Sequence, residues 1–142
     1  MKKNQKILIV SKNQFGYHID TYYYAKHLRK KYDMSYIGWD YDRDKVNLHG
    51  VNTYYVSRKG GVIKRYLRLQ KEIINHILGN DYDLHFIKYF RGCSFLRLLF
   101  PSKKFILDIR SASVSSNVFY RNLYNNLLKM ESRFFKNVTI IS

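Results

Sequence analysis

Short apolar runs alternate along the chain with longer segments in which apolar residues recur every three or four positions. The first example is KILIVSKNQFGYHIDTYYYAKHL, where the apolar run 7–10 leads into a polar turn containing Gly16 before the helical spacing begins. Short apolar runs favour buried strands, and a period of 3.6 residues favours helices. The pattern predicts strands at 6–10, 34–39, 51–56, 82–89, 104–109 and 138–141, and helices at 19–31, 63–78 and 119–135.

The segment 63–78 has the clearest helical pattern, and Gly79 behind it is a typical stop signal. Its apolar residues fall on one stripe, which we expect to pack on the sheet. The members of the stripe are Ile63, Tyr66, Leu67, Ile73, Ile74, Ile77 and Leu78.

Strands that alternate with helices indicate an α/β fold with a mostly parallel sheet and helices on both faces, in a doubly wound, Rossmann-like arrangement. The polar link 41–50 is too short for a regular crossover helix, although a parallel connection through a loop remains open. Ligands of such sheets bind beyond the carboxyl ends of the strands. This rule selects the loops 11–17, 39–43, 57–61, 88–94 and 110–116.

The 142 residues, 46% of them hydrophobic, are enough for one domain with a sizeable core, 1–142. A single cysteine, Cys93, excludes internal disulfides and fits a reducing compartment. The basic N-terminus lacks the long apolar run of a signal peptide, and no segment is apolar enough to span a bilayer. We therefore expect a soluble, cytoplasmic chain.

The net charge of +16 predicts an anionic partner, which could be nucleic acid, a membrane surface or a phosphorylated small molecule. Cations are concentrated before and along the segment 63–78, where they either contact an anionic membrane or acceptor or simply face water. The residues of this basic set are Arg58, Lys59, Lys64, Arg65 and Arg68.

The turn around Gly16 lacks both G-x-G-x-x-G and G-x-x-x-x-G-K-[ST], which argues against an NAD site and a Walker-type NTPase. It is either a connecting turn or a place where a sugar or phosphate approaches the backbone. In LDIRSASVSS, Asp108 and Arg110 share one face of a strand end. Arg110 could bind a phosphate or carboxylate, or the two residues could pair with local groups.

FIKYFRGCS places Lys88, Tyr89 and Arg91 at another strand end. These residues could bind an anionic or sugar ligand, or they could form a solvated loop. Cys93 has no base partner in the sequence that would make it a nucleophile. The five histidines show no metal-ligand spacing, and with ten acidic residues, paired carboxylates are hard to find. We therefore expect no metal and no cofactor.

In this order, KILIVSKNQFGYHIDTYYYAKHL, DMSYIGWDY, YDLHFIKYFRG, KKFILDIRSASV and NVTIIS resemble the N-terminal half of a family 4 (group 1) glycosyltransferase of the GT-B fold. The resemblance implies transfer of a sugar from a nucleotide-sugar, as substrate, to a hydroxyl, with retained anomeric configuration and no metal. It also implies a second, nucleotide-binding domain beyond Ser142. An ending on a bare apolar strand supports the same expectation that the chain is the front part of a longer protein.

The resemblance assigns Gly16, Tyr17 and Arg110 to the donor side, with Arg110 in the slot where family members often carry a histidine. Lys88, Tyr89, Arg91 and Asp108 are then expected on the acceptor side. The acceptor would be lipid-linked or a polysaccharide in bacterial surface-glycan synthesis, and the basic set would contact the inner face of the membrane.

The alternative is a stand-alone nucleic-acid-binding module without enzymatic activity, suggested by the charge, 14 tyrosines and 9 phenylalanines. Most of these aromatic residues fall in predicted strands or on helix stripes, where core packing explains them. No RNP-type or helix-turn-helix pattern is present. Nucleic acid is therefore the less expected partner.

Overall fold

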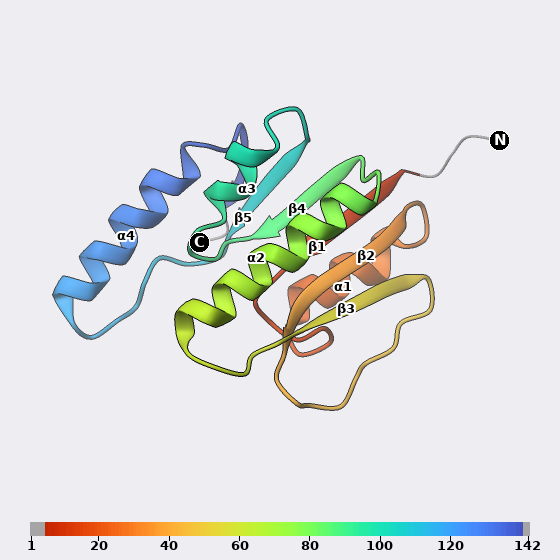
Figure 1. Ribbon diagram of the computed structural model, residues 1–142, viewed down its shortest axis with the longest axis horizontal. Coiled ribbons are helices and arrows are strands. Elements are labelled where there is room, and N and C mark those ends of the chain that lie inside the picture. The colour runs from red at the N-terminus through yellow and green to blue at the C-terminus, as the bar shows by residue number, and fades with distance from the viewer. Residues whose placement is uncertain (1–4, 141–142) are drawn as a thin grey trace.

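The structure, a computed structural model, describes residues 5–140 and contains one sheet of six parallel strands in the order β3-β2-β1-β4-β5-β6 (Figure 1). This confirms the predicted α/β, Rossmann-like class. The strands are β1 (Lys6–Val10), β2 (Asp33–Asp40), β3 (Val51–Ser57), β4 (Leu84–Lys88), β5 (Phe105–Ile109) and β6 (Asn137–Ile140). The helices are α1 (Ile19–Leu28), α2 (Val62–Gly79), α3 (Ser94–Leu99) and α4 (Val118–Ser132).

The observed elements differ from the predicted ones mainly at their ends. Helix α1 stops at Leu28, three residues early, and α4 stops at Ser132. Helix α3 was not predicted, because six residues are too few to show a helical period. The link 41–50 is a loop between parallel strands, which settles the alternative left open by the sequence. Ile141, the last residue of the predicted sixth strand, lies outside the described residues.

Apolar residues cover both faces of the sheet, as a parallel sheet requires. In β1, Leu8 and Val10 belong to the core beneath α2, whereas Ile7 and Ile9 belong to the core beneath α1. Figure 1 shows α2 crossing in front of the sheet and α1 lying behind it. The larger core also includes side chains from α3 and α4, so these helices share the face of α2.

The strand order reverses direction at the pair β1 and β4. From β1 the chain builds outward to β2 and β3, and α2 then carries it back across the sheet to β4. The loops that follow β1 and β4 therefore diverge to opposite faces, the arrangement that creates a crevice at the carboxyl edge of doubly wound sheets. Ligands of doubly wound sheets bind at this switch point.

The predicted apolar stripe of α2 is wrong in one respect. Ile73 and Ile77 are buried on the sheet as expected, together with Leu69. Ile63 and Leu67 are instead 76% and 64% exposed. The stripe is wider than the line along which the helix contacts the sheet, and none of the helices within residues 5–140 covers its outer part.

Candidate functional site

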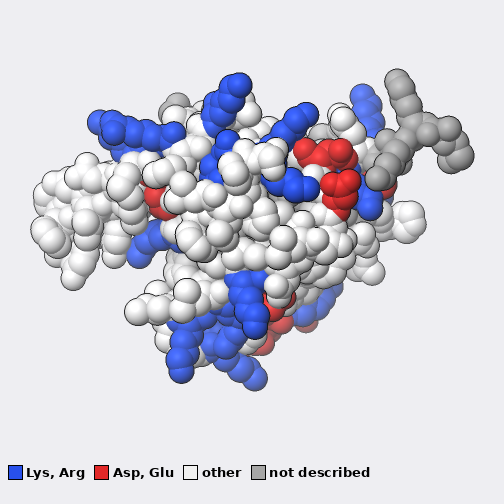
Figure 2. Space-filling view, turned by 45° about the horizontal axis from the view of Figure 1, so that its top comes forward, with Lys and Arg blue, Asp and Glu red and all other residues white. Residues whose placement is uncertain are grey.

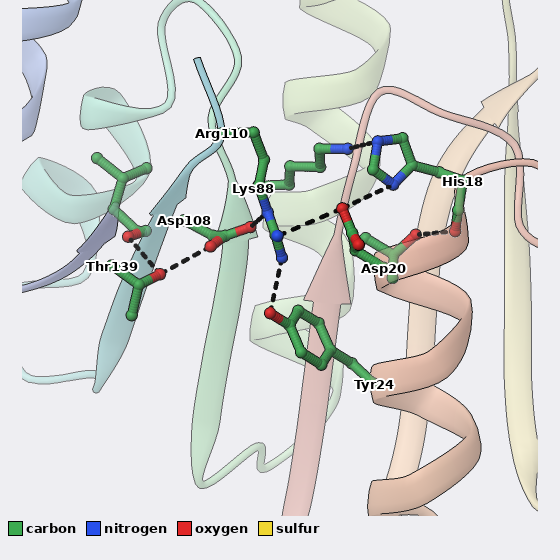
Figure 3. Close-up of polar contacts among 9 residues, drawn as sticks. His18, Asp20, Tyr24, Lys88, Asp108, Arg110 and Thr139 are labelled. Carbon is green, nitrogen blue, oxygen red and sulfur yellow. Dashed lines mark hydrogen bonds and ion pairs between the residues drawn. The ribbon is translucent and has the colours of Figure 1, made fainter. Parts of the chain in front are cut away.

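A cluster of polar side chains occupies the crevice at the switch point, at the carboxyl ends of β4 and β5 and the start of α1 (Figure 3). Its members come from elements far apart in the sequence and point toward one another. We call it the switch-point cluster, and it consists of His18, Asp20, Tyr24, Lys88, Asp108 and Arg110.

Asp108 and Arg110 form the most extensively bonded part of this cluster. Arg110 donates from Nε to Oδ2 of Asp108 at 2.6 Å and from Nη2 to the hydroxyl of Tyr24 at 2.7 Å. Its Nη1 lies 3.3 Å from a carboxylate oxygen of Asp20. The second oxygen of Asp108 accepts a hydrogen bond from Thr139 Oγ1 at 2.7 Å. Asp108 and Arg110 thus share a face as predicted, and they pair locally.

Arg110 is held in one orientation by these contacts. A guanidinium has five N–H donors. Among the described residues, two of these donors make hydrogen bonds to Asp108 and Tyr24, and a third lies toward the carboxylate of Asp20 in an ion pair. Two donors therefore stay available at the edge of the crevice, where the side chain is 18% exposed. A guanidinium fixed in this way can bind an incoming oxygen without first losing rotamer entropy.

Lys88 places a buried cation in the same crevice, since only 8% of the residue is exposed. Burial, reinforced by the charge of Arg110, lowers the pKa of Lys88 to about 8. Its Nζ forms a hydrogen bond with Nε2 of His18. Burial and the charge of Lys88 also lower the pKa of His18, so the imidazole is neutral at pH 7 and accepts this hydrogen bond.

The start of α1 adds partial positive charge to this crevice. His18 is the N-cap residue, and its side chain makes no capping hydrogen bond to the described residues of the helix. The first backbone N–H groups of a helix lack intrahelical partners and attract anions. Together with Lys88, they can bind a phosphate or another anion, while Asp20 can accept a hydrogen bond from a hydroxyl.

The predicted acceptor residues do not all meet at this site. Lys88 and Asp108 belong to the cluster, but Tyr89 and Arg91 lie on the α4 side of the sheet. Tyr89 donates from its hydroxyl to Glu131 at 2.8 Å, and the guanidinium of Arg91 lies 3.8 Å from the ring centroid of Tyr124. Successive residues at a strand end point to opposite faces, which separates Lys88 from Tyr89.

Glu131 of α4 anchors this second region. Its buried carboxylate also accepts hydrogen bonds from the N–H of Gly92 at 2.8 Å and from Oγ of Ser94 at 2.9 Å. Burial, reinforced by Glu131, raises the pKa of Cys93 to about 12. The thiol is therefore protonated at neutral pH, the form of cysteine that is a poor nucleophile.

Gly16 and Tyr17 lie against the loop between β2 and β3. Gly16 has φ of +88°, and a Cβ there would overlap the side chain of Val46. Tyr17 donates from its hydroxyl to the carbonyl of Asp44 at 3.1 Å. Packing between the two loops thus accounts for the glycine, and the recorded contacts of both residues are with the β2–β3 loop.

Gln14 joins these two loops and was missed by the sequence reasoning. It is 1% exposed, and its Nε2 donates to the carbonyl of Arg43 at 2.8 Å. Its Oε1 accepts from the N–H of Tyr41, also at 2.8 Å. Both ends of the amide are satisfied, so the loop after β1 is fixed to the loop after β2.

The basic set lies at the start of α2 and in the loop before it, and Figure 2 shows Lys and Arg gathered along the corresponding lower edge. The arginines of the basic set stabilise this loop through their contacts. Arg65 donates to the carbonyl of Gly60 at 2.7 Å, and Arg68 donates to that of Ser57 at 2.8 Å. The guanidinium of Arg58 lies 3.8 Å from the ring centroid of Tyr41. Lys59 and Lys64 are exposed.

His18, Asp20 and Tyr24 are members of the cluster that the sequence reasoning did not select. Their position at the start of the first helix, directly after the loop of β1, was the available signal. Among residues 5–140, no group of three or more His, Cys, Asp or Glu is placed to hold a metal ion, and none of the described helices is long and apolar enough to cross a membrane. No protein-family model matches the chain, and no curated protein is significantly similar to it.

Proposed function

We propose that the chain is the acceptor-side domain of a GT-B glycosyltransferase, which moves a sugar from a nucleotide-sugar to a hydroxyl of a lipid-linked or glycan acceptor. The observation that carries the proposal is the position of Lys88, a buried cation beside the uncapped start of α1 at the switch point of the sheet. The sequence resemblance described above supports the same function. It also supports assembly of surface polysaccharide as the biological setting.

The cluster offers the interactions that sugar transfer needs. The bond between C1 of the sugar and the donor phosphate breaks, a bond from C1 to the acceptor oxygen forms, and the acceptor proton passes to the departing phosphate. Lys88 and the start of α1 would stabilise the negative charge that develops on this phosphate. The two remaining donors of Arg110 would orient the sugar or phosphate, and Asp20 would hold the acceptor hydroxyl.

In this proposal the nucleotide is bound mainly by a second domain, so the present chain contributes one side of the cleft. The isolated chain would then bind donor weakly and transfer no sugar. Its measurable property is the anion site itself.

The anion site is tested by titrating the 142-residue chain with pyrophosphate and following backbone amide signals by NMR. We expect shifts at the start of α1 and at the end of β4. Lys88→Met should weaken binding at least about tenfold, as loss of one charge-assisted hydrogen bond predicts. Lys104→Met is the matched control, because Lys104 is exposed and precedes β5 at the opposite edge of the sheet.

Sugar transfer is tested separately, with the complete product of the gene and a panel of radiolabelled nucleotide-sugars. Arg110→Ala should lower turnover at least about tenfold, because the orienting donors are lost. Pyrophosphate binding without any transfer would contradict the glycosyltransferase and leave an anion-binding domain. Absence of both binding and transfer would contradict the site as well.

A further inference from the structure

The outer side of α4 carries apolar residues that the core does not use. Its inner side packs against the body of the protein through Leu128 and the buried Glu131. On the outer side, Tyr120, Leu123 and Met130 are 49%, 50% and 52% exposed. Figure 1 shows α4 at one side of the molecule, with its start farthest from the sheet. We call the outer set the α4 stripe, which consists of Tyr120, Leu123, Leu127, Met130 and, just after the helix, Phe134.

The spacing of the α4 stripe is that of a helix which pairs with another helix. Its members follow one another at intervals of three, four, three and four residues. An average interval of about 3.5 residues is the repeat of a coiled-coil seam, because it keeps apolar side chains in line along one side of a helix. The core is contacted by a different set, which includes Leu128 and Phe135. Helix α4 therefore has one apolar side for the core and a second for a partner.

We propose that two copies of the chain pair through the α4 stripe, as antiparallel helices related by a two-fold axis near Leu127. A two-fold interface requires a surface that complements itself. The stripe has this symmetry, because an aromatic residue lies at each end and one aliphatic residue lies between each end and Leu127. In such a pair Tyr120 faces the partner's Phe134, and Leu123 faces the partner's Met130.

The exposed area of the stripe is sufficient for a weak dimer. Phe119, which is 70% exposed, extends the stripe at the start of the helix. Since an aromatic side chain can bury about 150–250 Å² and an aliphatic one somewhat less, the exposed parts amount to about 500 Å² per copy. A symmetric pair would therefore bury about 1,000 Å², which is at the lower limit for specific protein interfaces.

The composition of α4 favours a protein partner over other partners. Aromatic residues and methionine, which form most of the stripe, are enriched in protein interfaces. A helix that lies on a bilayer is rich in Lys and Arg on its polar face. On α4, uncharged side chains occupy several of the polar positions, namely Asn122, Asn125 and Asn126. The symmetry of the stripe then selects a second copy of the same chain.

Pairing through the α4 stripe leaves the switch-point cluster open. Helix α4 shares the sheet face of α2, whereas the cluster contains Asp20 and Tyr24 of α1, which lies on the opposite face. The anion site and the dimer are therefore separate properties of the chain. This inference does not depend on sugar transfer.

The test is sedimentation velocity of the 142-residue chain between about 5 µM and about 200 µM, where we expect a shift from monomer toward dimer. Leu123→Lys should weaken the association at least about tenfold, because pairing would bury its ammonium group in the apolar seam. Asn122→Lys is the matched control, because it adds the same charge to α4 outside the stripe. It should change the association constant less than about twofold. Equal effects of the two changes would overturn the proposal.

The antiparallel arrangement is tested by cysteine cross-linking, since the native Cys93 is buried. Leu127→Cys should form a disulfide-linked dimer under mild oxidation, because the two-fold axis brings the two copies of this residue together. Tyr120→Cys should not, since its copies would lie about 20 Å apart along the paired helices, too far for a disulfide. Cross-linking of Tyr120→Cys would mean that the helices are parallel and would overturn the proposed pairing.

Salt distinguishes this self-association from attraction between opposite charges. Two copies with a charge of +16 repel each other, so raising sodium chloride from about 50 mM to about 500 mM should strengthen pairing at least about threefold. Weaker pairing at high salt would overturn the proposal, because ionic contacts would then hold the copies together. A chain that stays monomeric at about 200 µM in high salt would overturn it too. Pyrophosphate binding is measured separately, so failure of the dimer leaves the anion site untouched.

Discussion

Burial gives Lys88 an acid–base behaviour that an exposed lysine does not have. In the folded chain its pKa is about 8, against 10.5 for an ordinary lysine. Between these two pH values the unfolded chain binds the extra proton, so the free energy of unfolding rises with pH. Below about pH 8 both states are protonated, and the full cost of burying the ammonium group is present.

We predict that this pH dependence disappears in Lys88→Met. The stability of the wild-type chain relative to the variant should rise between about pH 8 and pH 10, with a slope of up to about 1.4 kcal/mol per pH unit. Urea unfolding at a series of pH values measures it. If the free energy of unfolding changed with pH in the same way in both proteins, Lys88 would not be desolvated in the folded chain.

Gly16 is required by backbone conformation and by packing. Gly16→Ala should destabilise the chain by about 1–3 kcal/mol, because it strains a positive φ and displaces Val46. Adding Val46→Ala should recover part of this loss in a double-mutant cycle of urea unfolding. Full additivity of the two changes would contradict the contact. Gly60→Ala is the control, since its φ is +96° but its Cβ would meet only ordinary contacts.

Glu131 gives a third test at this scale. Glu131→Gln keeps the size of the side chain but replaces a carboxylate oxygen that accepts hydrogen bonds with an NH₂ group. We expect a loss of about 1–3 kcal/mol in the free energy of unfolding. Glu72→Gln changes the other glutamate, which is half-buried, and should have little effect. Similar losses in both variants would show that the contacts of Glu131 are not stabilising.

At the scale of elements, the apolar pattern was sufficient where a strand is buried on both faces of the sheet and where a helix packs directly on the sheet. The run 7–10 is an example of the first case, and Ile73 and Ile77 are examples of the second. It failed for α3, which is too short, and for the outer part of the α2 stripe. Apolar periodicity shows which face could be buried, but it does not show whether a neighbour is present to cover that face.

The candidate site was predictable only in part, for a related reason. The rule on carboxyl strand ends selected Lys88, Asp108 and Arg110, which do meet. It could not separate Tyr89 and Arg91 from them, because it identifies loops and not the direction of side chains. The pairing of Lys88 with His18 joins residues 70 positions apart, and no local pattern encodes it.

Helix α4 provides a test at the same scale, because its start relies on one cap. The side chain of Asn117 accepts hydrogen bonds from the N–H of Phe119 at 3.0 Å and from that of Tyr120 at 3.3 Å. Asn117→Ala should cost about 1 kcal/mol and speed hydrogen exchange in α4 about fivefold. Asn126→Ala, in the exposed interior of the same helix, should slow exchange or leave it unchanged. Faster hydrogen exchange in Asn126→Ala than in Asn117→Ala would contradict the capping role of Asn117.

At the scale of the whole molecule, a charge of +16 on 142 residues opposes folding through self-repulsion. Raising sodium chloride from about 20 mM to about 300 mM shortens the screening length and should raise Tm. A falling Tm would instead mean that pairs such as Arg110 with Asp20 outweigh the repulsion.

Binding of oligonucleotides is the matching test of the nucleic-acid alternative. Arg58 and Arg91 already stack on Tyr41 and Tyr124, so these rings offer fewer free faces for bases. We expect weak binding that several hundred millimolar salt abolishes, as for any basic protein. Tight binding of a preferred sequence under those conditions would favour the alternative function.

The strand order also determines which edge of the sheet is exposed while the chain is being synthesised. β1 is made first, yet one of its two neighbours is β4, whose partner to Ile7 is Leu84. Until that partner has been synthesised, the nascent β1–β2–β3 sheet has an open, apolar edge at what will become its centre. Such an edge is prone to pair with other chains. Synthesis that pauses before Leu84 should therefore yield a product that depends on chaperones, whereas a pause after β5 leaves β1 paired on both sides.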